Sequence, residues 1–317
     1  MNYTRENLLN RHRLSHQQIN DLLGEQQNQF LFEEKLRQLN LLAAFLEITD
    51  YFQKENIWFL PLKGPLLSYR IYGDATCRYY RDFDFLVKPE AVASVIQVFH
   101  DWGYLYKQNR WPENESKRLK IISGVNQLTL YNPQKHQTVE IHWRVFIDPV
   151  IDYKKIQQIV NQNIISTEFA GRQMNQFTIE FELFYLIIHG GLHTWRRLKW
   201  LVDIHEIINR FTIDKRKFDE LVKLFNAQRM IGLCNEMLKQ FFPNSELLPV
   251  NYDVPTWFTR YCLKQINNNN NEAHPPYFSL MHKWFYLNAF PNIHYKRKRF
   301  FLMLSSFKKL NQALHSI

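Results

Sequence analysis

The stretch from Phe59 to Val87, FLPLKGPLLSYRIYGDATCRYYRDFDFLV, constrains the fold more than any other part of the chain. Near its end, Asp82 and Asp84 alternate with phenylalanines. Because successive side chains of a strand point to opposite faces, both carboxylates emerge on one face and the aromatic rings on the other. Two carboxylates on one face repel each other, and a divalent cation such as Mg2+, which prefers oxygen ligands, relieves that repulsion.

The residues before this acidic strand predict a strand, a turn and a short helix. Residues 56–62 are mostly apolar and predict the strand. Lys63 and Gly64 form the turn, and residues 65–73 predict a helix that begins with proline and ends with glycine, the residues favoured at these positions. A turn that opens a helix presents backbone N–H groups to an anion.

A later strand is expected to bring a third carboxylate to the same face. Residues 126–131 and 138–145 predict two strands, joined by a hairpin turn at residues 132–136. Glu140 and His142 lie two residues apart and therefore share one face of the second strand. Three carboxylates from two strands suit metal-assisted phosphoryl or nucleotidyl transfer. The alternative is that the aspartates lie on a solvated edge strand and Glu140 pairs with a neighbouring cation.

The composition places the chain among globular proteins. Apolar residues make up 45% of the sequence, which includes 8 Trp, 16 Tyr and 25 Phe, and this excludes a disordered chain. The sequence contains 9 glycines, few for its 317 residues, and has no G-x-G-x-x-G, G-x-x-x-x-G-K-[ST] or G-x-S-x-G motif. Dinucleotide-binding, P-loop and serine-hydrolase signatures are therefore missing from the sequence.

Cysteine spacing and hydropathy indicate the compartment. Cys77, Cys234 and Cys262 are widely spaced and include no C-x-x-C pair, which favours a reducing compartment without a disulfide framework or a thiolate zinc site. Residues 1–30 are polar, and no apolar run approaches the roughly 18 residues of a membrane-spanning helix. We therefore expect a cytoplasmic protein without a transmembrane segment.

The charge balance indicates the kind of partner. A formal net charge of +10 and a pI of about 9.4 favour a nucleotide, a nucleic acid or an anionic membrane surface. The alternative is a basic balance that serves only solubility. Residues 296–309, KRKRFFLMLSSFKK, join basic residues to an apolar stretch. They predict either contact with an anionic membrane surface or a helix that packs on the core and displays its lysines.

The order of the predicted elements divides the chain into three parts. A helical flank spans residues 1–54, a core of strands and helices spans residues 55–150, and a helical domain spans residues 151–317. The helices predicted for the last part cover residues 179–211, 218–242, 280–290 and 296–314.

Four segments together resemble a known protein family. They are LKGPLL, RYYRDFDFLV, VEIHWRV and LIIHGGLHTWRRLKWLVDIHEII. These segments are similar to the uncharacterised bacterial nucleotidyltransferase family of the DNA polymerase β superfamily, over roughly residues 60–210. The resemblance implies an α+β fold, in which helices flank a small mixed β-sheet and the C-terminal half is mainly helical.

The resemblance also implies an activity and the residues that perform it. It predicts an enzyme dependent on Mg2+ or Mn2+, which moves a nucleoside monophosphate from a nucleoside triphosphate to a hydroxyl group. The acceptor is expected to be a small molecule, a saccharide or a peptide. Matched residue by residue, Asp82 and Asp84 correspond to the metal-binding pair, and Glu140 corresponds to the third metal-binding and catalytic carboxylate.

The first turn departs from the pattern of the superfamily. Gly-Gly or Gly-Ser is expected there to hold the triphosphate, whereas this chain has Lys63, Gly64 and Pro65. We expect Lys63 to place a positive charge on the phosphates, although Pro65 removes one backbone donor. The alternative function is therefore a catalytically inactive protein of the same fold, which binds a nucleotide or an RNA.

Other polar residues near the acidic strands are candidates for nucleotide contacts. Arg78 and Arg81 precede the first acidic strand and either bind phosphate or pair with the aspartates. His142 shares the face of Glu140 and is expected to support it.

The later segment adds candidates for substrate contact. His189 and His193 are four residues apart, a spacing that suits two metal ligands on a helix. Because Gly190-Gly191 separates them and no H-E-x-x-H motif is present, they are expected to be core or cleft histidines; the alternative is that one of them contacts substrate. Residues 195–199 form a basic and aromatic patch that either binds a base or phosphate or is an ordinary helix surface.

Overall fold

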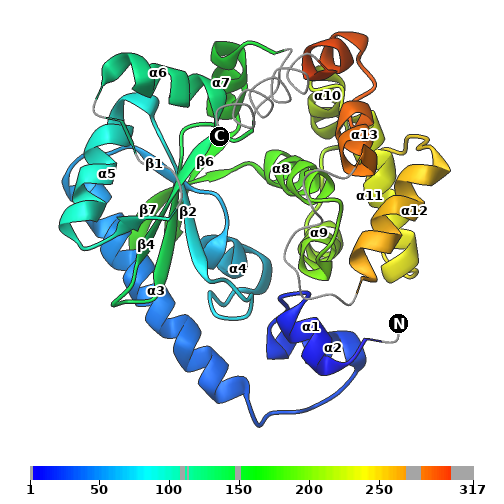
Figure 1. Cartoon of the computed structure of the whole chain (residues 1–317). Coiled ribbons are helices and arrows are strands. Elements are labelled where there is room, and N and C mark those ends of the chain that lie inside the picture. The colour runs from blue at the N-terminus through cyan, green and yellow to red at the C-terminus, as the bar shows by residue number, and fades with distance from the viewer. Residues whose placement is uncertain (1–2, 108–110, 113, 147–150, 269–279, 301–317) are drawn as a thin grey trace, which may run out of the picture. The chain divides into compact units, whose positions relative to one another are not determined.

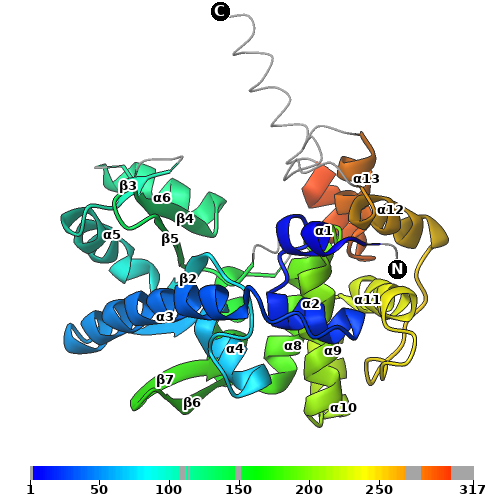
Figure 2. The same ribbon diagram turned by 90° about the horizontal axis from the view of Figure 1, so that it is seen from below.

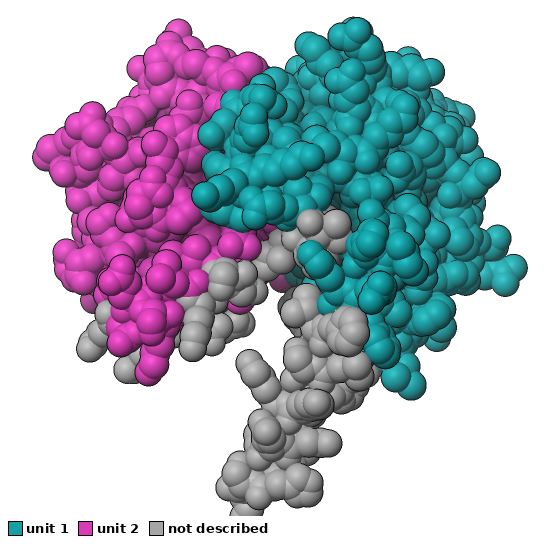
Figure 3. Space-filling view, turned by 90° about the horizontal axis from the view of Figure 1, so that it is seen from above, with its two compact units in different colours: residues 1–12, 148–163, 178–317 teal, residues 13–147, 164–177 magenta. Residues whose placement is uncertain are grey.

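The computed structural model of the 317-residue chain describes residues 3–107, 111–112, 114–146, 151–268 and 280–300. The chain divides into two compact units, which Figure 3 shows in different colours. Unit 1 comprises residues 1–12, 148–163 and 178–317, and unit 2 comprises residues 13–147 and 164–177. The division into parts at residues 54 and 150 stays a prediction.

Unit 2 is built around a five-stranded sheet with the strand order β1-β2-β5-β4-β3. β2 and β5 run parallel, and the other neighbours run antiparallel, so the sheet is mixed. Figure 1 shows helices flanking this sheet. The strands are β1 (Phe59–Pro61), β2 (Asp82–Val87), β3 (Leu105–Tyr106), β4 (Gln127–Asn132) and β5 (Gln137–His142).

The phenylalanine face of β2 packs against helix α3 (Leu31–Lys54). The Phe45 ring lies 5.9 Å from the Phe83 ring and 5.5 Å from the Phe85 ring, and all three side chains are almost fully buried. Successive side chains of β2 point to opposite faces of the sheet, so this packing directs Asp82 and Asp84 to the side opposite α3. The core therefore fixes the side of the sheet on which the carboxylates lie.

The described residues of unit 2 also form four more α-helices, a short 3-10 helix (Pro89–Ala91) and a hairpin. The helices are α2 (His16–Leu23), α4 (Gly64–Tyr72), α5 (Val92–Asp101) and α6 (Glu115–Gly124). The hairpin consists of β6 (Ile164–Phe169) and β7 (Arg172–Phe177), and Figure 2 shows it near α3 and α4. Asn175 donates a hydrogen bond of 2.8 Å to the backbone oxygen of Phe59 in β1.

The β6–β7 hairpin was not predicted from the sequence. Its two-residue turn places both Ala170 and Gly171 at positive φ. Such turns are recognised in a sequence mainly by Asn-Gly or Asp-Gly, which are missing here, and the strands themselves alternate weakly.

Unit 1 is helical within the residues described. Helix α8 (Ile179–Leu192) is buried along nearly its whole length and contacts α9, α10 and α11. The mixed sheet of unit 2 and the helices of unit 1 confirm the predicted α+β class with a mainly helical C-terminal half. Among the described residues, no helix has the length and apolarity needed to cross a membrane. The other helices of unit 1 are α1 (Arg5–Asn10), α7 (Tyr153–Gln162), α9 (Leu198–Arg210), α10 (Lys215–Leu224), α11 (Gln228–Phe241), α12 (Thr256–Ile266) and α13 (Leu280–Asn288).

Candidate active site

The parallel pairing of β2 and β5 brings three potential ligands together. Asp84 is paired with Glu140, and His142 is paired with Leu86, so the three polar side chains share one face of the sheet. One potential ligand atom from each of Asp84, Glu140 and His142 lies within 4.8 Å of the others. The register between two strands therefore assembles a group that neither strand contains alone.

His142 is buried between the two carboxylates. Its Nε2 atom lies 3.5 Å from Oε2 of Glu140 and 3.7 Å from Oδ1 of Asp84. Neither ring nitrogen has a hydrogen-bond partner among the described residues. Burial opposes the charged imidazolium, but the two carboxylates outweigh this effect and raise the pKa of His142. The sequence predicted a supporting role for this residue, and the structure places it in the ligand group itself.

Glu140 is held from a neighbouring strand. The side-chain amide of Gln127 in β4 donates a hydrogen bond of 2.6 Å to Oε2 of Glu140. Burial is the main cause that raises the pKa of Glu140, and the nearby Asp84 carboxylate adds to it, while His142 opposes it. Gln127 was missed in the sequence, although counting back along the predicted hairpin pairs it with His142 and places it on the same face.

The Lys63 turn lies beside Asp84. The Nζ atom of Lys63 is 3.4 Å from Oδ2 of Asp84, and both side chains are largely buried. The turn is tied to the strand because the backbone N–H of Leu62 donates to the backbone oxygen of Asp84 at 2.9 Å. Gly64 adopts a φ of +67°, which favours glycine, and Pro65 lies in the first turn of α4. The predicted phosphate-binding turn and the predicted metal ligands thus adjoin each other.

The donor set fits a divalent cation. Asp84 and Glu140 supply carboxylate oxygens, which Mg2+ and Mn2+ prefer, and His142 adds an imidazole nitrogen. One of the two unpartnered nitrogens of the buried imidazole gains a partner when it binds a metal as the neutral ring. Asp82 lies on the same strand face but is exposed and does not belong to this group. Its role as a metal ligand stays a prediction.

The two arginines before β2 differ in their surroundings. Arg78 is buried, and its backbone N–H donates to the Ser68 hydroxyl at 3.0 Å. Arg81 is exposed, donates through Nε to the Tyr79 hydroxyl, and places its guanidinium 5.1 Å from the centre of the Tyr79 ring. Tyr79 therefore orients the Arg81 side chain, and contacts of either arginine with phosphate stay predictions.

His189 and His193 lie in unit 1, in a cluster around Trp200. The two imidazole rings are 4.6 Å apart, and the His193 ring stacks on the Trp200 ring at 5.1 Å. The guanidinium groups of Arg196 and Arg197 lie over the Trp200 ring, at 6.0 Å and 5.9 Å from its centre. We call these residues, with Trp200, the histidine–tryptophan cluster. It shares only Arg196 and Arg197 with the basic and aromatic patch predicted at residues 195–199, and its contact with substrate stays a prediction.

A strained turn supports the histidine–tryptophan cluster. Thr194 and Trp195 both have positive φ, at +55° and +52°, although neither is glycine. The buried Trp195 ring lies directly on the backbone of α8, because a Cβ atom added at Gly190 would lie 2.3 Å from it. The glycine is therefore required by close packing between the turn and the helix.

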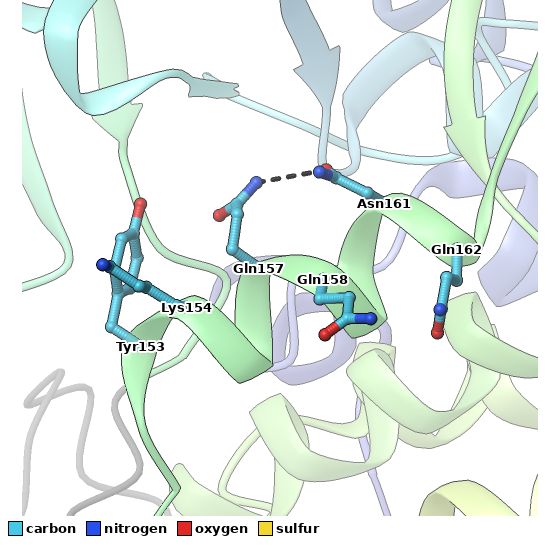
Figure 4. A pocket seen from close by; sticks show the side chains of 6 residues that line it. All are labelled: Tyr153, Lys154, Gln157, Gln158, Asn161 and Gln162. Atoms are coloured by element: carbon cyan, nitrogen blue, oxygen red, sulfur yellow. Dashed lines mark hydrogen bonds between the residues drawn. The ribbon is translucent and has the colours of Figure 1, made fainter.

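An open hollow of about 450 Å3 lies along α7, also in unit 1. Figure 4 shows side-chain amides along it, with Gln157 bonded to Asn161. Its lining contains one lysine and one tyrosine but no carboxylate or imidazole. Because carboxylates and imidazoles are the side chains that would bind a divalent cation here, this hollow does not offer the chemistry of the β2–β5 group.

Comparisons with known proteins identify a family for the chain. A family model described as an uncharacterised nucleotidyltransferase matches residues 9–243. The solved structure of the lincosamide antibiotic adenylyltransferase LnuA with bound lincomycin is 17% identical, with a TM-score of 0.38 over 54% of this chain and 97% of that one. An antigenic nucleotidyltransferase-like protein from Paracoccidioides brasiliensis is 16% identical, with a TM-score of 0.39 over 66% of this chain and 90% of that one. No curated protein matches the sequence.

Proposed function

The chain belongs to the uncharacterised nucleotidyltransferase family, an enzyme family, and from this premise we propose its reaction. It transfers a nucleoside monophosphate from a nucleoside triphosphate to a hydroxyl group, with Mg2+ or Mn2+. The hydroxyl oxygen forms a bond to the α-phosphorus, the bond between the α- and β-phosphates breaks, and pyrophosphate leaves. The acceptor is a small molecule, a saccharide or a peptide. Membership of the family confirms the resemblance seen in the sequence.

The observation that carries this proposal is the group formed by Asp84, Glu140 and His142 on neighbouring parallel strands. These residues hold the cation, and Asp82, on the same face, extends the acidic surface toward solvent. A divalent cation held by these residues would neutralise charge on the triphosphate and help to orient it for attack.

The side chains of the site accept the proton of the attacking group and bind the phosphates. Glu140 accepts the proton of the attacking hydroxyl, and Gln127 fixes the orientation of its carboxylate. Lys63 places its ammonium group on the phosphates, and Gly64 allows the turn that brings it there. In unit 1, His189 or His193 contacts a substrate.

The proposal is tested with the Asp84→Asn variant, which keeps the size of the side chain and removes its charge. We expect transfer of radiolabelled nucleoside monophosphate, assayed with ATP, GTP, CTP and UTP, to be abolished while the circular dichroism spectrum is retained. Asp101→Asn, an exposed change at the end of α5, is the matched control and should keep full activity. Near-normal turnover of Asp84→Asn would refute the assignment.

The second candidate is an inactive protein of the same fold that binds a nucleotide or an RNA. It is favoured by the Lys63–Asp84 ion pair, because a lysine that neutralises Asp84 opposes cation binding there. Thermal unfolding with Mg2+ and each nucleotide separates the two functions. A metal-dependent shift that is lost in Asp82→Asn/Asp84→Asn supports the enzyme. Salt-sensitive RNA binding that survives this double substitution, without any metal-dependent shift, supports the second candidate.

A further inference from the structure

Residues 280–300 of unit 1 expose an unusual combination of apolar and basic side chains. Leu280 is 82% exposed, Ile293 63% and Trp284 53%, which is high for large apolar residues. The segment contains lysines and arginines but no aspartate or glutamate. We call the following set the basic apolar surface: Leu280, Met281, Lys283, Trp284, Ile293, Lys296, Arg297, Lys298 and Phe300.

The first half of this surface belongs to α13. Phe285 and Ala289 are fully buried and attach the helix to the rest of unit 1. Leu280, Met281 and Trp284 lie at positions i, i+1 and i+4, and therefore point away from that buried side. α13 therefore carries large apolar side chains on its exposed face as well as on its buried face.

The second half is α-helical over residues 293–300. The side chain of Asn292 caps it by accepting hydrogen bonds from the N–H groups of His294 and Tyr295, at 2.7 Å and 3.2 Å. Ile293, Arg297 and Phe300 are spaced so that they share its outer face, and all three are exposed.

Contacts between aromatic side chains join the two halves into one folded piece. The Tyr295 ring packs 4.8 Å from the Phe290 ring, and its hydroxyl donates to the backbone oxygen of Tyr286 at 3.4 Å. The guanidinium of Arg299 lies 5.6 Å from the centre of the Tyr286 ring. The outer faces of both helical segments are therefore presented by the same folded region.

We propose that the basic apolar surface binds peripherally to an anionic lipid bilayer. Aliphatic side chains and a tryptophan enter the boundary between head groups and acyl chains, and lysines and arginines pair with anionic head groups. Trp284 suits this boundary because its ring is apolar and its indole N–H is polar. Three of its five exposed apolar side chains, Leu280, Met281 and Ile293, offer no ring on which a base can stack, which favours lipid over nucleic acid as the partner.

Sedimentation with lipid vesicles tests the proposal on the full chain. We expect binding to vesicles of phosphatidylcholine and phosphatidylglycerol in equal amounts, and much weaker binding to phosphatidylcholine alone. Arg297→Gln/Lys298→Gln should lower the affinity at least about tenfold, because each cation near an anionic surface contributes several-fold. Trp284→Ser/Ile293→Ser should also lower it about tenfold through the lost apolar contact.

Matched variants on other surfaces of unit 1 provide the controls. Lys215→Gln/Lys217→Gln removes two exposed charges from α10, and Leu247→Ser removes a partly exposed apolar side chain. Both controls should bind vesicles as the unchanged protein does. Equal losses in control and test variants would overturn the proposal, because binding would then depend on total charge or hydropathy. Absence of vesicle binding, or binding to single-stranded RNA instead of vesicles, would overturn it as well.

Discussion

The β2–β5 group in unit 2 and the histidine–tryptophan cluster in unit 1 both gather polar side chains, but different forces position them. In unit 2, the register of two parallel strands pairs Asp84 with Glu140. In unit 1, a turn with two residues at positive φ orients the rings of His193 and Trp200. A strand register sets spacing through many backbone hydrogen bonds, whereas a strained turn depends on the packing of a few side chains.

This difference explains why the two clusters suit different tasks. The β2–β5 group combines two carboxylates with a buried imidazole, and a cation requires such ligands at fixed spacing. The histidine–tryptophan cluster offers aromatic faces and guanidinium groups, which tolerate small displacements of a partner. We therefore expect substitutions in unit 2 to affect turnover, and those in the unit 1 turn to affect stability.

The largest effect is expected for Glu140→Gln. The amide keeps the shape of the side chain but neither accepts a proton nor neutralises a cation, so turnover should fall by about 10²–10⁴-fold. The measurement is steady-state transfer with saturating nucleotide. Glu168→Gln on the β6–β7 hairpin is the matched control and should retain activity. Equal activity of the two variants would show that the carboxylate on β5 is not catalytic.

A smaller loss is expected for Gln127→Leu. It removes the hydrogen bond to the Glu140 carboxylate, and the usual strength of a hydrogen bond to a charged group predicts about a tenfold loss of turnover. Gln157→Leu removes an exposed amide of α7 that bonds to Asn161 at 3.2 Å. This control should leave turnover unchanged. A loss in Gln157→Leu equal to that in Gln127→Leu would contradict the assignment of the site to β4 and β5.

The turn in unit 1 is tested with Gly190→Ala. The added Cβ would overlap the Trp195 ring, and overpacking of this kind costs about 1–3 kcal/mol of unfolding free energy. Denaturant unfolding measures this cost. Ser94→Ala, an exposed change in α5, serves as a control for helix substitution and should change stability by less than about 0.5 kcal/mol. Unchanged stability of Gly190→Ala would show that the turn tolerates displacement of Trp195.

His12 gives unit 1 a dependence on pH. Its Nδ1 atom accepts a hydrogen bond of 3.1 Å from the N–H of Leu198, at the start of α9, where Arg197 provides no side-chain cap. Burial, together with Arg11 and Arg197, lowers the pKa of His12 to about 3. The unfolded chain therefore binds this proton at a higher pH than the folded chain does.

Stability from His12 is present above the unfolded pKa and is lost as pH falls below it. Between about pH 6 and pH 4, this residue should lower the unfolding free energy by about 1.4 kcal/mol per pH unit. Unfolding in denaturant at several pH values measures the slope. His12→Asn keeps an acceptor without a titrating proton and should flatten the slope. His294→Asn, at an exposed position, should leave it unchanged, and equal slopes in all three proteins would exclude His12 as the cause.

Much of the fold and part of the site followed from local patterns. The alternation of Asp82 to Phe85 predicted β2 and the face of its carboxylates, and the residues around Glu140 predicted β5. The helices at residues 31–54 and 179–210 followed from apolar spacing. These features could be predicted because side-chain direction repeats with a short period along one element. The part of the C-terminal tail at residues 301–309 lies outside the described residues.

The features of the fold and the site that were not predicted from the sequence depend on contacts between segments that are far apart in the chain. Gln127 joins the site only through strand register, and His12 caps a helix that begins far along the chain. The β6–β7 hairpin lacks the Asn-Gly or Asp-Gly pair by which two-residue hairpin turns are usually predicted. None of these contacts has a signature within a short window of sequence.

By itself, the sequence determined where polar and apolar side chains alternate along a strand and where helices begin and end. It also determined that two aspartates share one face of a strand. Only the tertiary structure decided that Asp84, Glu140 and His142 meet, and that Lys63 pairs with Asp84. The physical reason is that strand and helix periods are properties of neighbouring residues. The pairing of separate strands, in contrast, is chosen by how the whole apolar face, with Phe45 against Phe83 and Phe85, is buried.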